Sequence, residues 1–119
     1  MLLFADLKSV FRDHQGEVGW TLVTIALAEF VGTALLIFFT CLSSLVGMSQ
    51  DPPVPLQVAL CSGLTVAIII QIFGHISAAH LNPAVSIAAV VLEQINIPLA
   101  IVYIVSECSG AIVGFGLLK

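Results

Sequence analysis

The sequence predicts an all-α transmembrane fold with three spanning helices and one re-entrant half-helix. Three apolar segments, at about 20–46, 56–73 and 97–118, approach or exceed the roughly 20 residues that cross a hydrocarbon core. A fourth, at about 82–92, is too short, since at about 1.5 Å per residue it covers only half of the bilayer. The chain is 60% hydrophobic and 8% charged, whereas a soluble domain carries roughly a quarter charged residues.

Residues 1–19 are polar and mixed in charge, and we expect them to form a cytoplasmic tail rather than a removable signal peptide. Lys8 and Arg12 are the basic residues of this tail, and the positive-inside rule then places the N-terminus in the cytoplasm. We expect an integral protein of the plasma membrane, with the lipid bilayer as its surroundings. The net charge of -4 argues against nucleic acid as a partner.

The first span begins at Trp20, which suits an interfacial anchor. Ala28 and Gly32 are spaced for close helix packing. Glu29 lies between them, and an ionisable residue in a spanning helix normally faces the protein interior and has a partner there. A proline-rich loop at 47–55 then leads to the uncharged second span.

The last span starts near Pro98, a residue suited to the first turn of a helix. It carries Glu107 and a Gly110-x-x-x-Gly114 pair suited to tight helix contact. The cysteines are odd in number and lie in apolar segments, which indicates small packing residues rather than disulfides or metal ligands. The sequence predicts neither a metal site nor a cofactor.

The short apolar segment follows a break at 74–81, which we expect to be an open loop. Backbone groups at membrane depth need internal partners unless they line a watery cavity or are buried in protein. Asn82 can cap the half-helix with its side-chain oxygen, leaving its NH2 group as an outward donor. Pro83 suits the first helical position, and the small side chain of Ala84 leaves space beside the helix N-terminus. With the partial positive charge of a helix N-terminus, these features would bind a water oxygen and repel cations.

The ionisable residues near this break have structural as well as functional interpretations. For His75 we favour a structural histidine that satisfies loop carbonyls, and for His80 structural support and a pore-lining carbonyl remain equally open. For Glu29 we favour a buried acceptor that holds the loop rather than a proton carrier. Glu107 could face a partner or the pore periphery, and the sequence does not decide between them.

Three motifs resemble the major intrinsic protein family, the aquaporins and aquaglyceroporins, and the resemblance covers residues 20–118. The stretch 74–85 is similar to the first pore loop with its Asn-Pro-Ala triplet, 28–33 to the first-helix motif, and 103–111 to the third helix. The resemblance implies six tilted helices and two half-helices built from two inverted repeats, of which this chain supplies the first. It also implies a homotetramer of the complete protein, with one pore per subunit.

The resemblance further implies roles for individual residues. Asn82 is expected to be the first of two pore asparagines that bind permeating water, and Glu29 corresponds to the buried carboxylate that braces the loop. The residues expected to line the pore are Ala78, Ala79, His80, Asn82, Pro83 and Ala84, the first three through their carbonyls. Ser62 falls at the second-helix position of the selectivity filter, where water-selective members usually carry a large aromatic. A small hydroxyl there favours solutes such as glycerol or urea beside water.

The chain also departs from the family pattern. Ala78 replaces a common glycine, and Glu107 stands where glutamine is usual. The second triplet, the filter arginine that follows it and the fifth helix are not within these 119 residues, so a fragment and a natural short form are both open.

The functional expectation is therefore a passive channel for water and small neutral solutes such as glycerol or urea, present here as an incomplete half. The alternative is a truncated, non-conducting form that associates or interferes with full-length subunits. A proton-coupled transporter using Glu29 and His80 is a less favoured third hypothesis. No nucleophile–base pair or phosphate loop indicates an enzyme.

Overall fold

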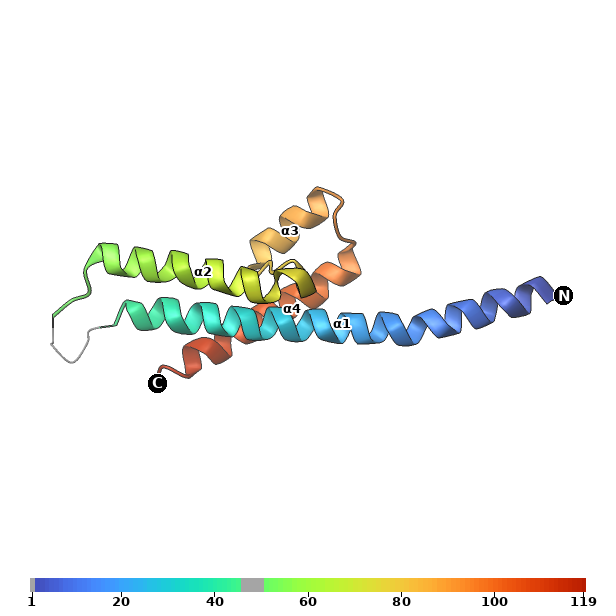
Figure 1. The fold of residues 1–119 in the computed structure, drawn as a ribbon, viewed down its shortest axis with the longest axis horizontal. Coiled ribbons are helices and arrows are strands. Elements are labelled where there is room, and N and C mark those ends of the chain that lie inside the picture. The colour runs from blue at the N-terminus through green and yellow to red at the C-terminus, as the bar shows by residue number, and fades with distance from the viewer. Residues whose placement is uncertain (1, 46–50) are drawn as a thin grey trace.

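The computed structural model describes residues 2–45 and 51–119, with side chains described from Gly19 onward. The described chain forms four helices: α1 (Leu2–Ser43), α2 (Pro55–Ser77), α3 (Pro83–Val91) and α4 (Ile97–Gly116) (Figure 1). Among the described residues, three stretches are long and apolar enough to cross a membrane, namely Gly19–Ser43, Pro55–Ser77 and Ile97–Gly116. These helices confirm the predicted all-α fold, with α3 as the short half-helix.

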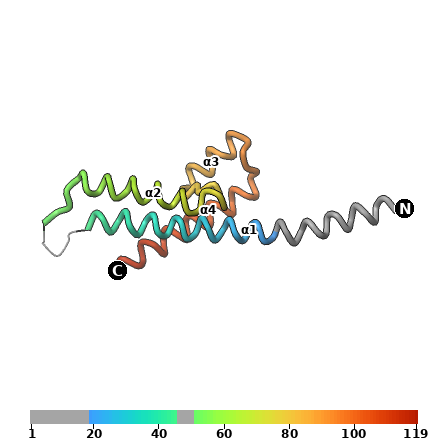
Figure 2. Tube along the Cα trace, in the orientation of Figure 1, coloured from blue at the N-terminus to red at the C-terminus, as the bar shows by residue number. Residues whose placement is uncertain are grey.

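Helix α1 is the centre of the assembly, because both α2 and α4 pack on it. Helix α2 runs alongside α1, and α4 crosses it, as the tube in Figure 2 shows. Helix α3 turns away from the end of α2 and packs on α4. The loop between α2 and α3 is thereby placed where the ends of these helices meet the middle of α1.

Glycines let α1 and α4 approach closely. A Cβ atom at Gly110 would overlap the backbone oxygen of Phe30, and one at Gly114 would overlap that of Ala34. The Gly-x-x-x-Gly pair therefore makes the tight helix contact that its spacing predicts. Gly32 lets the Leu81 side chain pack closely on α1, since a Cβ atom at position 32 would lie 2.6 Å from that side chain.

The helix boundaries differ from the prediction in two places. Helix α2 continues to Ser77 instead of ending near residue 73, because the stretch 74–77 contains no proline and keeps its helical hydrogen bonds. The helix ends where Ala78 turns left-handed, with φ of 65°, and donates its N–H to the Gly74 carbonyl. The predicted open loop at 74–81 was therefore too long, and only residues 78–82 connect α2 to α3.

At the other boundary, α1 begins at Leu2, so the segment predicted as a tail is helical and continuous with the first span. Its cytoplasmic location stays a prediction. The predicted end of the first span, at about 46, and residues 47–50 of the predicted loop at 47–55 lie outside the described residues.

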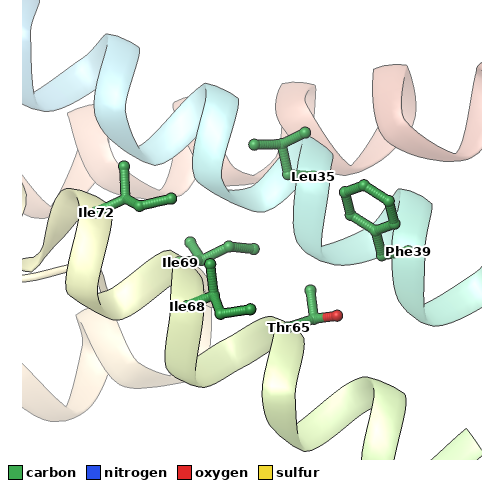
Figure 3. Close-up of a pocket in the computed structure, with 6 residues that line it drawn as sticks. All are labelled: Leu35, Phe39, Thr65, Ile68, Ile69 and Ile72. Atoms are coloured by element: carbon green, nitrogen blue, oxygen red, sulfur yellow. The ribbon is translucent and has the colours of Figure 1, made fainter.

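An apolar groove of about 270 Å³ lies between α1 and α2 (Figure 3). It is lined by Leu35, Phe39, Thr65, Ile68, Ile69 and Ile72. Thr65 is the one polar residue of this lining, so the groove suits lipid tails or apolar helix faces and not a polar solute. The candidate site lies instead at the loop between α2 and α3.

Candidate functional site

The loop at 78–82 has an unusual backbone for a segment without glycine. Ala78, Ala79 and Leu81 have positive φ values of 65°, 50° and 56°. The left-handed region costs a residue with a Cβ atom roughly 1–2 kcal/mol. Such a conformation persists when the surrounding structure determines it, and in this protein the surroundings are two buried glutamates and a tyrosine.

Glu29 of α1 holds the loop from one side. Its Oε1 accepts hydrogen bonds from the Ser77 hydroxyl at 2.6 Å and from the His80 backbone N–H at 3.0 Å. Its Oε2 accepts from the Leu81 backbone N–H at 2.7 Å. The side chain is 0% exposed, and hydrogen bonds to an ionised carboxylate are about twice as strong as neutral ones. Glu29 thus satisfies backbone groups that the bilayer would leave without partners.

Helix α4 supports the same loop through Tyr103. The Tyr103 hydroxyl donates to the Ser77 carbonyl at 2.5 Å, and its ring packs on the His80 ring with centroids 4.4 Å apart. The Ser77 hydroxyl in turn accepts from the Ala79 N–H at 3.2 Å. The end of α2 is therefore fixed to both α1 and α4.

A second buried carboxyl, Glu107, lies on the α3 side of the loop. Its Oε1 is 2.7 Å from the Ser86 hydroxyl, which is 2.9 Å from Nδ1 of His80. Glu107 and Ser86 are both 0% exposed. The Glu107 side chain, which the sequence left undecided, therefore faces the half-helix and not a distant partner.

Asn82 and Pro83 open α3 as the sequence predicts. The Asn82 side-chain oxygen accepts from the Ala84 N–H at 2.9 Å, and Pro83 occupies the first helical turn. The Asn82 side chain is exposed, and within the described chain no hydrogen bond occupies its NH2 group. The arrangement leaves an oriented amide donor at the N-terminus of a half-helix.

Other predicted site residues lie as follows. Ala79 is buried inside the loop, whereas Ala78 and Ala84 are exposed beside it. His75 lies on the last turn of α2 with an exposed side chain, and in the part of the chain that is described it makes no hydrogen bond to the loop. Its predicted place in the loop was wrong, because α2 extends past it.

Ser62 lies far from the loop. Its hydroxyl donates to the Val58 carbonyl of its own helix at 2.8 Å. The fifteen residues from Ser62 to Ser77 correspond to about 22 Å along α2. A filter at Ser62 and the Asn82 amide would therefore be two separate points along a solute path.

Sequence reasoning missed Ser86 and Tyr103 as site residues. A helical spacing of four was the available signal: Ser86 lies four residues after Asn82, and Glu107 four after Tyr103. Residues at this spacing share a helix face, so each pair could have been placed toward the loop once Asn82 and Glu107 were singled out.

The fold and site define a class of membrane protein. This protein has a half-helix and a loop held by buried hydrogen bonds, and both lie among helices of spanning length. Transport proteins use such discontinuous helices to direct backbone groups and helix ends at a solute. The chain belongs to the major intrinsic protein family, whose model matches residues 18–119. It is an integral membrane protein.

Curated relatives show the same kinship. The chain is 38% identical over 116 residues to Aquaporin-4 of Mus musculus and 37% identical over 116 residues to Aquaporin-4 of Homo sapiens. Both alignments cover 95% of this chain and 35% of the relative. Identity to Aquaporin-2 of Rattus norvegicus is 38% over 104 residues, covering 83% of this chain and 38% of the relative. The chain thus spans about a third of the length of the curated relatives it matches.

Proposed function

We propose that this chain is the first repeat of a passive water channel. The observation that carries the proposal is the geometry at Asn82, whose side-chain oxygen is used in capping α3 while its exposed NH2 group stays available as a donor. A permeating water can accept from this group and move on, because one hydrogen bond is worth only about 1 kcal/mol net. Relatives named as aquaporins support the same function.

The electrostatics of the loop favour a neutral solute. The N-terminus of α3 carries a partial positive charge of about half a unit, which attracts a water oxygen and opposes a cation. Glu29, the carboxylate nearest to the loop backbone, is fully buried and uses both oxygens on the loop. Such a site binds and releases without chemistry, so the proposal is a channel and not an enzyme.

For the complete protein, we propose a second, inverted repeat that closes the pore, assembly as a homotetramer, and a plasma-membrane location with a cytoplasmic N-terminus. The outer faces of the described helices expose many large apolar side chains that lipid or further protein would cover. Ser62 supports passage of small neutral solutes such as glycerol or urea beside water, because its small, half-buried side chain would leave the proposed filter position wide.

Osmotic swelling of vesicles tests the proposal. The complete subunit that carries this chain should accelerate swelling over protein-free vesicles, and the rate should not depend on a proton gradient. Residues 1–119 alone should give no acceleration, because one repeat does not enclose a pore. A complete subunit that swells vesicles no faster than lipid would contradict the channel and favour a non-conducting form that associates with other subunits.

A further inference from the structure

The two buried glutamates of the site have very different surroundings. Glu29 accepts from three donors, which use both of its oxygens. Oε1 of Glu107 lies within hydrogen-bond distance of the Ser86 hydroxyl, and the Asn82 backbone amide is the other donor near this carboxyl group. Its Oε2 is buried and has no hydrogen-bond partner among the described residues. Both carboxylate oxygens of Glu29 therefore have hydrogen-bond partners, whereas Oε2 of Glu107 has none among the described residues.

This difference in hydrogen bonding affects which of the two glutamates can be ionised. An ionised carboxylate taken out of water costs several kcal/mol unless charges or hydrogen bonds compensate it. The surroundings of Glu29 supply that compensation. Around Glu107, the described chain supplies only these two donors, and Glu29 is a second buried carboxyl group that contacts the same loop. Two carboxyl groups that share a site disfavour simultaneous ionisation, so the one with fewer hydrogen-bond donors should hold the proton.

The neutral form also sets the direction of a hydrogen-bond chain, because the acid proton finds a partner at Oε1 and none at Oε2. A hydroxyl has a single proton to donate, so Ser86 can donate either to Glu107 or to His80, but not to both. We propose that Glu107 is a neutral carboxylic acid that donates from Oε1 to Ser86, that Ser86 donates to Nδ1 of His80, and that His80 is thereby held as the tautomer protonated at Nε2. Glu107 is then a positioning residue that acts through Ser86.

The consequence concerns which solutes the loop favours, and it rests on the proposed channel function. The His80 ring is half-buried against Tyr103, and its Nε2 lies on the ring edge away from the Ser86 contact. With a proton at Nε2, His80 offers a donor there and no lone pair. The loop then carries two side-chain donors suited to oxygen acceptors, the Asn82 NH2 group and Nε2 of His80, and the His80 ring has no free lone pair for a cation.

Histidine-labelled solid-state NMR of this chain in lipid bilayers tests the tautomer, with the His80 signals assigned by His80→Gln. We expect the wild type to be protonated at Nε2 and unprotonated at Nδ1. Glu107→Gln should leave this pattern unchanged, because the amide NH2 can donate to Ser86 as the acid does. Ser86→Ala should shift part of the population to the Nδ1–H tautomer. A wild type protonated at Nδ1, a switch in Glu107→Gln, or no change in Ser86→Ala would each overturn the proposal.

Isotope-edited infrared spectroscopy is a second test, because it detects the carbonyl band of the protonated Glu107 carboxyl group itself. A purely structural role of Glu107 would not require that band. A carboxylic-acid carbonyl band should be present at neutral pH, disappear in Glu107→Gln and persist in the matched variant Glu93→Gln, whose glutamate lies in the exposed turn before α4. Absence of that band in the wild type would overturn the neutral state. Neither spectrum requires flux, so failure of this proposal and failure of the channel function are separately visible.

Discussion

Oε2 of Glu29 lies 2.7 Å from the backbone nitrogen of Leu81, a residue 52 positions later in the chain. This contact joins the middle of the first span to a loop with left-handed backbone, and Oε1 makes the parallel contact to His80. A single buried carboxylate therefore holds two consecutive amides in one geometry. The stability and the shape of the loop should both depend on it.

Replacing Glu29 by Gln should destabilise the protein by about 1–3 kcal/mol, because an amide NH2 group would then face N–H donors that need an acceptor. The free energy of unfolding in mixed micelles measures this cost. Hydrogen exchange at the His80 and Leu81 amides should also become faster. Glu93→Gln, in the exposed turn, is the matched control and should change neither quantity. Unaltered exchange in Glu29→Gln would contradict the bracing role.

Ala78→Gly should stabilise the protein by about 1 kcal/mol, because glycine adopts the φ of 65° without the penalty that a Cβ atom brings. Ala59→Gly, at an exposed position inside α2, should instead destabilise by roughly 1 kcal/mol through lost helix propensity. The free energy of unfolding in mixed micelles measures the change in stability for both variants. Equal signs for the two substitutions would show that the loop does not hold Ala78 in a left-handed conformation.

Gly110→Ala should destabilise the α1–α4 contact by about 1–3 kcal/mol, because the new methyl group meets the rigid backbone oxygen of Phe30. Gly116→Ala is the matched control on the same helix, since nothing lies within 4 Å of a Cβ there. It should be neutral or stabilise by up to about 1 kcal/mol. If both variants unfold like the wild type, α1 and α4 do not pack as closely as described.

Ser62→Phe in the complete subunit should reduce glycerol flux more than water flux, because the added ring narrows the path at the proposed filter. The ratio of the two fluxes, measured by swelling in sorbitol and in glycerol gradients, is the quantity to compare. Ser109→Phe, on α4, serves as a control that adds the same ring elsewhere. Equal loss of both fluxes in Ser62→Phe would refute the selectivity proposal.

Much of the architecture was predictable from the sequence, because lipid demands long apolar helices and Asn82-Pro83 is a strong helix start. The end of α2 was not, since small and polar residues at 74–77 look like a loop while nothing in them breaks a helix. The contacts of Glu107 could not be predicted either. They depend on how α3 tilts onto α4, and that tertiary arrangement brings Ser86 to a carboxyl 21 residues later.

The central claim is that the free amide donor of Asn82 binds permeating water, and Asn82→Ser tests it most directly. Serine keeps a capping oxygen and removes the NH2 group, so α3 should stay intact. Asn96→Ser is the matched control, because Asn96 caps α4 in the same way, with Oδ1 2.9 Å from the Leu99 nitrogen. Water permeability per complete subunit, measured by stopped-flow swelling, should fall about fivefold in Asn82→Ser, the equivalent of a hydrogen bond of about 1 kcal/mol. It should stay at the wild-type value in Asn96→Ser. An undiminished permeability in a folded Asn82→Ser subunit would contradict the claim.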